Sequence, residues 1–423
     1  MRNSTLATTR TLAVALIGFG ALALPACGGE TGGQATPGSG GASAGTGGGS
    51  GGGQAPGSGG SAPGTGGSAP VADAGSGGAP VTDGGPAAAD GMSDTAGNPG
   101  GGAFNADVMT MMRKVADWQL PTVGGAKDWI HGAMWTGLMA TYNVTKDPKY
   151  LAAVVKWAGD WSLAGGAGAR GDNQCAAQTF FDAYLVDPTP ANMVRLTAKS
   201  SFDQLVANTP AGRTEWWWED ALFMVPPGFA RLGAATGNKQ YFATMNQMYW
   251  DTYAFLWNAQ ASLMYRDHRG NDNSFWSRGN GWVIGGAVRV LDYLPADDPK
   301  RPNFVKLVQD MSGALKAAQG MDGCWRSNIL NQQALPNPET TGSGFFTFGI
   351  AWGVNHGILD KATYQPIAQK GWDCLVSHVD ATGKLGYAQP VGAGPGVAPA
   401  GNSEPFGVGA FLLAGSEIGK FAQ

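Results

Sequence analysis

The sequence predicts an all-α fold, an (α/α)6 barrel (a six-hairpin toroid) preceded by a disordered linker. From residue 104 onward, apolar residues recur with helical spacing and strong strand patterns are few. Apolar, charge-poor segments alternate six times with more polar, amphipathic segments. Turn-forming residues connect the two kinds of segment, which gives roughly 53 residues per hairpin.

The apolar segments are expected to be buried inner helices of the ring. They are Asp128–Thr145, Gly171–Val186, Thr214–Thr236, Ser274–Leu294, Glu339–Leu359 and Gly401–Lys420. The expected outer helices are Phe104–Gln119, Pro148–Trp161, Pro190–Val206, Lys239–Trp257, Pro302–Gln319 and Ala362–Val379. A linear solenoid of helical hairpins has the same signature and is the alternative architecture.

Residues 1–103 are expected to lie outside this fold. Residues 1–26 combine early arginines with an apolar run from Leu12 to Leu24 that is too short to span a bilayer, as in a secretory signal. The string Leu24-Pro25-Ala26-Cys27 resembles a bacterial lipobox, so we expect a lipoprotein signal peptide and lipidation of Cys27. An ordinary signal peptide is the alternative. Residues 27–103 are rich in Gly, Ser, Ala and Pro and predict a disordered tether to a catalytic domain at 104–423.

These features predict an exported protein that is lipid-anchored at the bacterial cell envelope and touches the membrane through its anchor only. The net charge of -4 favours neither nucleic acid nor an anionic membrane surface. After Cys27, three cysteines remain, without close spacing, and they indicate neither a metal motif nor an obvious disulfide framework: Cys175, Cys324 and Cys374. With only four histidines and no zinc pattern, we expect no metal and no cofactor.

In an alternating ring the inner helices run parallel, so their N-terminal ends gather at one mouth of the barrel. Carboxylates, indoles, amides and one arginine lie at these ends. They are Asp128, Trp129, His131, Asp172, Asn173, Gln174, Trp216–Asp220, Trp276, Arg278, Asn280, Trp282, Glu339, Thr340, Ser343, Ser403 and Glu404. Helix capping explains some of the acids. It explains neither the tryptophans nor Arg278, because a cation is disfavoured at the positive end of a helix.

The string Trp216-Trp217-Trp218-Glu219-Asp220 predicts a general acid for sugar chemistry. Indoles stack on sugar rings, and a carboxylate shielded from water has a raised pKa. Glu219 and Asp220 point about 100° apart on a helix, so only one of them faces the lumen. We expect Asp220 to be the acid, and Pro226-Pro227 to kink or end the helix behind it.

A second carboxylate, Asp172, is expected at the same mouth, where hydrolysis needs water activation. For both Asp172 and Asp220 the alternative is a helix-capping role. The string from Ser274 to Trp282 adds Arg278, whose planar guanidinium matches a carboxylate, and indoles that can stack on a ligand. This predicts an acidic sugar as ligand, and the alternative for Arg278 is a structural ion pair.

Several strings resemble glycoside hydrolase family 105, the unsaturated rhamnogalacturonyl hydrolases, which are related to the family 88 unsaturated glucuronyl hydrolases. They are Trp218–Met224, Phe275–Trp282, Asp322–Arg326, Glu339–Phe345 and Gly383–Pro390. The resemblance runs in order over about residues 108–415 and implies an (α/α)6 barrel without a metal.

The resemblance also implies the chemistry. Asp220 would protonate C4 of a terminal 4,5-unsaturated uronic acid and also activate the water that adds at C5, and Asp172 matches the second family carboxylate. The expected substrate-binding residues are Trp129, His131, Trp218, Met224, Arg266, Trp276, Arg278, Asn280 and Ser343. The chain departs from many relatives at Asn173, where they have an acid, and around Tyr265-Arg266-Asp267, where they have a histidine.

The sequence therefore predicts an enzyme that releases unsaturated galacturonyl or glucuronyl residues from lyase-generated oligosaccharides, such as rhamnogalacturonan fragments from pectin. In this interpretation Trp216, Trp217 and Glu219 serve packing and support. One alternative is a conventional inverting glycosidase on the same barrel, with two carboxylates spaced around a water molecule. Another is a non-catalytic, surface oligosaccharide-binding lipoprotein.

Overall fold

The computed structural model describes residues 103–268 and 274–421. The predicted signal peptide over residues 1–26, the lipidation of Cys27 and the predicted tether up to residue 102 lie outside the described residues. Within the described part, none of the helices has the length and apolar character needed to cross a membrane.

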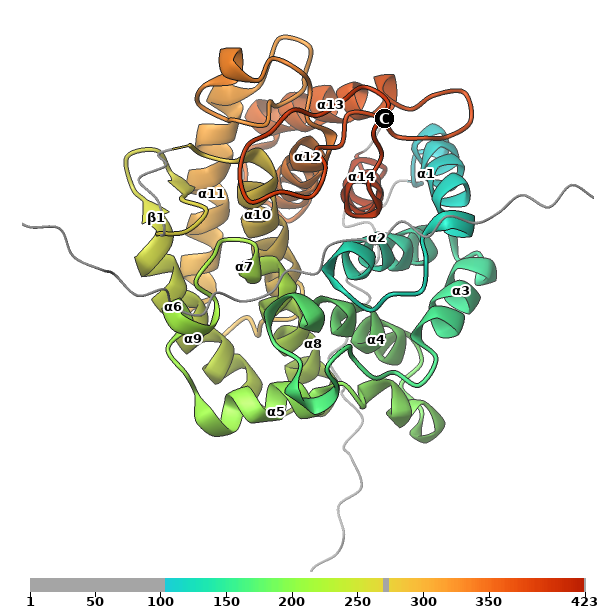
Figure 1. Cartoon of the computed structure of the whole chain (residues 1–423), viewed down its shortest axis with the longest axis vertical. Helices are drawn as coiled ribbons and strands as arrows, with labels where there is room; N and C mark the ends of the chain where they lie inside the picture. Colours follow the sequence, from blue (N-terminus) through green and yellow to red (C-terminus); the bar gives the residue numbers. More distant parts are fainter. Residues whose placement is uncertain (1–102, 269–273, 422–423) are drawn as a thin grey trace, which may run out of the picture. The chain divides into compact units, whose positions relative to one another are not determined.

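Six inner helices form a closed ring within the described residues. They are α2 (Trp129–Thr145), α4 (Cys175–Val186), the pair α7 (Ala221–Met224) and α8 (Pro226–Thr236), α10 (Ser277–Leu291), α12 (Thr340–Asn355) and α14 (Pro405–Ile418). Each packs on the next, and α14 packs back on α2 (Figure 1). The predicted (α/α)6 barrel is confirmed, and a linear solenoid is excluded because the ring closes.

The outer helices are α1 (Ala106–Gln119), α3 (Pro148–Ala158), α5 (Lys199–Asn208), α9 (Gln240–Leu256), α11 (Arg301–Ala318) and α13 (Lys361–Ser377). The short elements are η1 (Leu120–Thr122), η2 (Gly166–Gly168), η3 (Gly171–Gln174), η4 (Pro190–Leu196), η5 (Gln332–Ala334), α6 (Gly212–Glu215), and the antiparallel pair β1 (Trp257–Asn258) and β2 (Leu263–Met264). The third inner helix is broken after Val225, where Pro226 and Pro227 open α8 as predicted.

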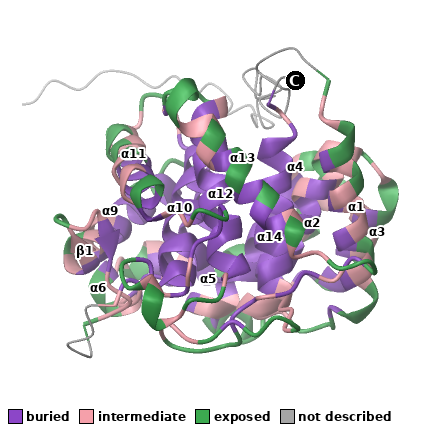
Figure 2. Cartoon of the chain, turned by 90° about the horizontal axis from the view of Figure 1, so that it is seen from above, coloured by how far each residue is buried: buried purple, intermediate pink, exposed green. Residues whose placement is uncertain are grey.

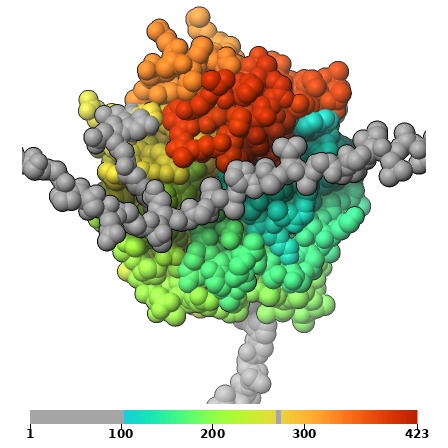
Figure 3. All heavy atoms as spheres, in the orientation of Figure 1, coloured from blue at the N-terminus to red at the C-terminus, as the bar shows by residue number. Residues whose placement is uncertain are grey.

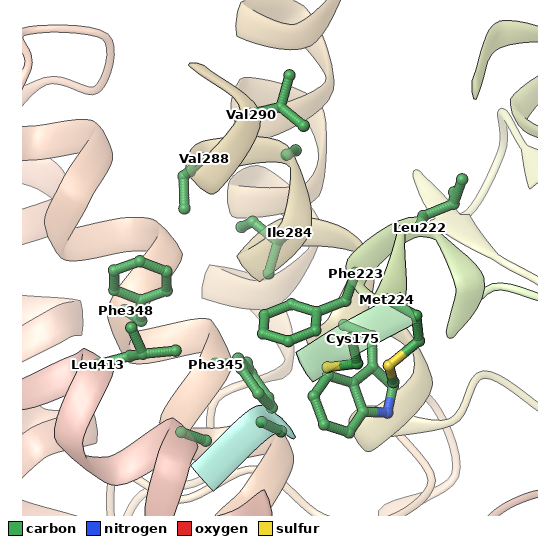
Figure 4. Packing of buried hydrophobic residues seen from close by; sticks show 14 of the residues in the cluster. Cys175, Leu222, Phe223, Met224, Ile284, Val288, Val290, Phe345, Phe348 and Leu413 are labelled. Atoms are coloured by element: carbon green, nitrogen blue, oxygen red, sulfur yellow. The ribbon is translucent and has the colours of Figure 1, made fainter. Parts of the chain in front are cut away.

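The inner helices are buried on nearly all sides because they carry almost no charge. All of α10 is buried, and α12 is buried from Thr340 to Val354. Figure 2 shows buried residues along α10, α12 and α14, and exposed residues on outer helices such as α1 and α3. In the centre, Phe223 lies 5.2 Å from the ring of Phe345, and both point into the cluster that Figure 4 draws.

Glycines close the ring between the first and last inner helices. A Cβ added to Gly137 of α2 would lie 2.5 Å from the carbonyl oxygen of Gly409, and a Cβ on Gly409 would lie 2.2 Å from the carbonyl oxygen of Ala133. The two backbones are in direct contact, so only glycine fits at these positions.

A disulfide joins Cys324, before α12, to Cys374 in α13. The sequence did not indicate this pair, because the two residues are 50 positions apart and come together only in the ring. Cys175 is buried and unpaired within the described residues. A nitrogen of His378 lies near the paired sulfurs, but a disulfide offers no thiolate to a metal ion.

Candidate active site

The inner helices all begin at the same end of the ring, which faces the viewer in Figure 1. The segments that precede α10, α12 and α14 form one half of this face in Figure 3. A cavity of about 410 Å³ opens there between η3 and the segment that leads to α7. It is lined by Arg170, Gly171, Asp172, Asn173, Thr214, Glu215, Trp217 and Trp218.

The structure places Asp172 in the wall of this cavity, and the charge of Asp220 acts on Asp172. Asp172 lies in η3, and Asp220 immediately precedes α7. Asp220 occupies the N-cap position of α7, but its side chain makes no capping hydrogen bond, and no side chain caps α4. The capping alternative is therefore not observed for either acid.

Burial raises the pKa of both acids and so favours their protonated forms. Burial, followed by the negative charge of Asp220, raises the pKa of Asp172 to about 6, while Arg266 opposes this rise and Asp128 adds to it. Burial also raises the pKa of Asp220, against the nearby positive charges of Arg266 and Arg278. The buried Oδ2 of Asp220 has no hydrogen-bond partner within the described residues. A proton held there can be transferred to a ligand.

Glu219 faces α10 instead of the cavity. Its side chain is 0% exposed, and Oε2 accepts a hydrogen bond from Nδ2 of Asn280 at 3.0 Å. Burial, together with the charge of Asp220, raises the pKa of Glu219 well above its ordinary value. A Cβ at position 279 would lie 1.7 Å from Oε1, so Gly279 makes room for this carboxyl group. Glu219 therefore supports the site from behind.

The three consecutive tryptophans have different surroundings. Trp216 is 0% exposed and serves packing, as expected. Trp218 lies against the backbone of η3, since a Cβ on Gly171 would be 2.8 Å from its Cη2 atom. Trp217 lines the cavity, and the guanidinium of Arg266 lies 5.2 Å from its ring centroid. Trp217 was expected to serve packing and support, and the structure also gives it a place in the cavity wall.

Arg278 is buried below the segment that precedes α14. Its Nη1 atom donates to the carbonyl oxygen of Gln389 at 2.7 Å and to that of Pro390 at 3.1 Å, and Nη2 donates to that of Gly392 at 3.3 Å. The guanidinium lies 4.3 Å from the ring centroid of Trp276. Within the described residues it forms no ion pair, so the ion-pair alternative is not observed. Its charge still acts on Asp220.

The other predicted binding residues divide into two groups. Trp129 stacks on Phe406 at 5.1 Å near the cavity face, and Nδ1 of His131 lies 2.6 Å from Oδ1 of Asp128. The remaining three are buried, and hydrogen bonds of the fold occupy the polar side chains. They are Met224, Asn280, which bonds Met264 and Glu219, and Ser343, whose Oγ accepts from the nitrogen of Trp325 at 3.0 Å.

Sequence reasoning missed two charged residues of the cavity wall, Arg170 and Glu215. The ion pair between Arg170 and Glu215, at 3.1 Å, forms part of the cavity wall. Asp128 contributes its negative charge to Asp172, although hydrogen bonds from His131 outweigh burial and lower the pKa of Asp128 itself. The sequence does not predict the ion pair between Arg170 and Glu215, because the two residues lie 45 positions apart.

A ring of six helical hairpins with a pair of half-buried acids and indoles at one mouth defines the class of the protein, a glycoside hydrolase. The family model described as Glycosyl Hydrolase Family 88 matches residues 104–422, and the chain belongs to this family. The resemblance of the sequence to the related families 105 and 88 is thereby confirmed.

Three relatives show how the chain compares with known proteins. It is 33% identical over 357 residues to an unsaturated 3S-rhamnoglycuronyl hydrolase of Formosa agariphila, covering 76% of this chain and 93% of the relative. A solved structure of a family 88 glycosyl hydrolase from Bacteroides vulgatus is 28% identical, with a TM-score of 0.69, covering 75% of this chain and 99% of that one. Another, described as a polysaccharide lyase, is 33% identical with a TM-score of 0.69, covering 74% and 97%.

The Glu219→Gln variant is expected to become more stable than wild type as pH rises, because wild type loses stability and the variant does not. Because the folded-state pKa of Glu219 is raised, its contribution to stability is fully present below the ordinary glutamate pKa of about 4.3 and is lost as pH increases toward the folded pKa. Glutamine has the same shape and does not titrate. The difference in Tm between Glu219→Gln and wild type should therefore grow between about pH 5 and pH 8.

The control is Asp128→Asn, because the pKa of Asp128 is lowered and the sign reverses. This variant should be less stable than wild type at neutral pH, with a deficit that shrinks as the solution is acidified. A Tm difference for Glu219→Gln that stays flat with pH would contradict the assignment of a buried, proton-holding Glu219.

Proposed function

We propose that the protein releases the terminal 4,5-unsaturated uronic acid, galacturonyl or glucuronyl, from lyase-generated oligosaccharides such as rhamnogalacturonan fragments. The observation that carries this proposal is a pair of half-buried acids: Asp220, whose pKa is raised by burial, acts by its charge on Asp172, which lines a cavity together with Trp217 and Trp218. The relative from Formosa agariphila, named an unsaturated 3S-rhamnoglycuronyl hydrolase, supports the same substrate class.

The proposed reaction is hydration of the C4=C5 enol ether. Asp220 donates its proton to C4, and positive charge develops at C5 and the ring oxygen. Water adds at C5 after losing a proton to Asp220, which is then carboxylic acid again. The resulting hemiketal opens, and the rest of the oligosaccharide leaves. A half-buried pair of acids suits this chemistry, because one holds the proton while the negative charge of the other stabilises the cation.

Two arginines favour a substrate that carries a carboxylate. Arg266 and Arg278 both act electrostatically on Asp220. The Nη atoms of Arg278 are bonded to backbone carbonyls, whereas the side chain of Arg266 is 26% exposed and lies over Trp217 of the cavity wall. Arg266 also pairs with Asp267. In the proposed complex, the uronate carboxylate lies in the positive field of these two residues.

Asp220→Asn should abolish the reaction. The amide cannot donate the proton, so kcat should fall by about 10³-fold or more while the fold is retained. The assay follows loss of the ultraviolet absorbance of the enol ether in unsaturated disaccharides. The matched control is Asp160→Asn, since Asp160 is exposed and its partners within the described residues are Lys127 and Ser162. Full activity of Asp220→Asn would overturn the proposal.

The same assay separates the alternatives. Cleavage of saturated sugars only would indicate a conventional inverting glycosidase, and binding without turnover would indicate an oligosaccharide-binding lipoprotein. New absorbance formed from an intact polysaccharide would indicate a lyase, the activity in the name of one solved relative.

The pH dependence should report Asp172. With its pKa raised to about 6, Asp172 is ionised only above that pH. We expect kcat/KM to increase with pH through about 6 and to decrease at higher pH, when Asp220 loses its proton. Asp172→Asn should remove the increase near pH 6 and lower kcat/KM by roughly 10- to 100-fold. An unchanged acidic limb in this variant would contradict the role of Asp172.

We also propose that the protein is exported and lipid-anchored at the cell envelope through Cys27. The support is the string Leu24-Pro25-Ala26-Cys27 after an apolar leader, followed by a Gly-rich segment that would hold the enzyme away from the membrane. The membrane is thus a partner only through the lipid.

Cys27→Ser should move the protein from the membrane fraction to a form that needs no detergent for extraction. Mass spectrometry of the wild-type N-terminus should find an acylated cysteine. Wild-type protein that is recovered without detergent and with an unmodified N-terminus would refute the anchor, and an ordinary signal peptide would then explain the leader.

A further inference from the structure

The short helix that follows Asp220 lacks its normal hydrogen bonds at its C-terminal end. In an α-helix, the carbonyl of Phe223 would accept from the nitrogen of residue 227, four positions later. Position 227 is a proline, which has no N–H group, and so is position 226. The break between α7 and α8 therefore leaves a carbonyl in the core that needs another donor.

Gln178 supplies that donor from the neighbouring helix. It lies on α4, its side chain is 0% exposed, and Nε2 donates to the carbonyl oxygen of Phe223 at 2.7 Å. The nitrogen of Phe223 in turn donates to the carbonyl oxygen of Asp220 at 3.0 Å. Phe223 thus joins the amide of Gln178 directly to the backbone of the proton donor.

An arginine fixes the orientation of the Gln178 amide. Oε1 of Gln178 accepts from Nε of Arg289 at 2.9 Å, and Nη2 of Arg289 donates to Oδ2 of Asp182 at 3.2 Å. Oδ1 of Asp182 accepts from Nε of Arg231 on α8 at 2.6 Å. Because Arg289 is only a donor, Oε1 must face it, and Nε2 must point to Phe223. This buried chain links α4, α10 and α8.

The other acid, Asp172, lies just before α4, the helix that carries Gln178. Asp172 lies in η3, which continues directly into α4, six positions before Gln178. The charges that face Asp172 are Asp220, Arg266 and Asp128. Any shift of α7 against α4 changes the separation of the two acids, and within the described residues no other side-chain hydrogen bond joins α7 to α4.

We propose that Gln178 is a positioning residue for catalysis, whose amide holds α7 against α4 and so sets the placement of Asp220 relative to Asp172. The proposal rests on the proposed function, in which these two acids perform the reaction. Gln178 does not touch the reacting atoms. It acts through the backbone of Phe223.

The test compares Gln178→Met with Asn355→Leu in the full enzyme. The methionine keeps the volume of the side chain and removes the hydrogen bonds to Phe223 and Arg289, together with a weak one to Sγ of Cys175 at 3.9 Å. Asn355 is a matched control, because its Nδ2 joins α12 to α14 through the carbonyl and carboxylate oxygens of Glu417, at 3.0 and 2.8 Å, without touching α4 or α7. Gln178→Glu is the second variant, since it keeps an acceptor for Arg289 but offers no donor to Phe223.

For Gln178→Met we expect kcat to fall about tenfold with KM within about twofold, as for a misplaced catalytic group. The limb of the pH profile near pH 6 should shift by about half a unit or more, because the interaction between the acids changes. Gln178→Glu should show the same split between kcat and KM. Asn355→Leu, at a comparable loss of Tm, should keep the wild-type kcat and pH profile.

A kcat within twofold of wild type and an unmoved pH limb in both Gln178 variants would overturn the proposal. So would an equal loss of kcat in Asn355→Leu, since the effect would then be one of general stability. If wild type does not act on unsaturated uronides, the proposed function fails. The effect of Gln178 on the interaction between Asp220 and Asp172 is then tested without an activity assay. The pKa of Asp172 is then obtained by NMR of labelled carboxyl carbons, assigned with Asp172→Asn, and an unchanged pKa in Gln178→Met overturns the proposal.

Discussion

The backbone contact between α2 and α14 at Gly137 and Gly409 is the constraint on which the placement of the site depends. It joins the first inner helix to the last, so the hairpins form a ring instead of an extending array. In a ring of alternating hairpins the inner helices are parallel, and their N-terminal ends share one mouth. Asp172 and Asp220 belong to different hairpins and meet for this reason.

The chemistry of the mouth follows from how its charges are buried. Water exclusion raises the pKa of Asp220, and the proximity of Asp220 adds to the effect of burial on Asp172. Arg266 limits both rises and Arg278 limits that of Asp220, so the site holds a proton and still contains positive charge for an acidic sugar. The third carboxyl group, that of Glu219, points to the Asn280 amide and therefore away from the cavity.

The buried polar residues below the mouth form a hydrogen-bonded network that supports the site. Asp182, Arg231 and Arg289 are almost fully buried, and removing one partner of such a network strands the others without compensation. Here the network ends on the Gln178 amide, which satisfies the carbonyl that the proline pair leaves open. A break in the helix beside Asp220 and a buried glutamine on α4 are thus two parts of one arrangement.

By itself the sequence determined the ring of hairpins, most helix bounds and the proline break, because helical periodicity and proline geometry are local properties. It missed the 3-10 turn before α5 and the late start of α7, since these two helices begin at Lys199 and Ala221 instead of Pro190 and Thr214. Its motifs also pointed to the family and to Asp172 and Asp220 as the acids. Only the tertiary structure decided that Trp217 lines the cavity, that backbone carbonyls bind Arg278, and that Cys324 pairs with Cys374. These outcomes depend on which segments, far apart in the sequence, come into contact when the ring closes. A local sequence pattern does not determine such contacts.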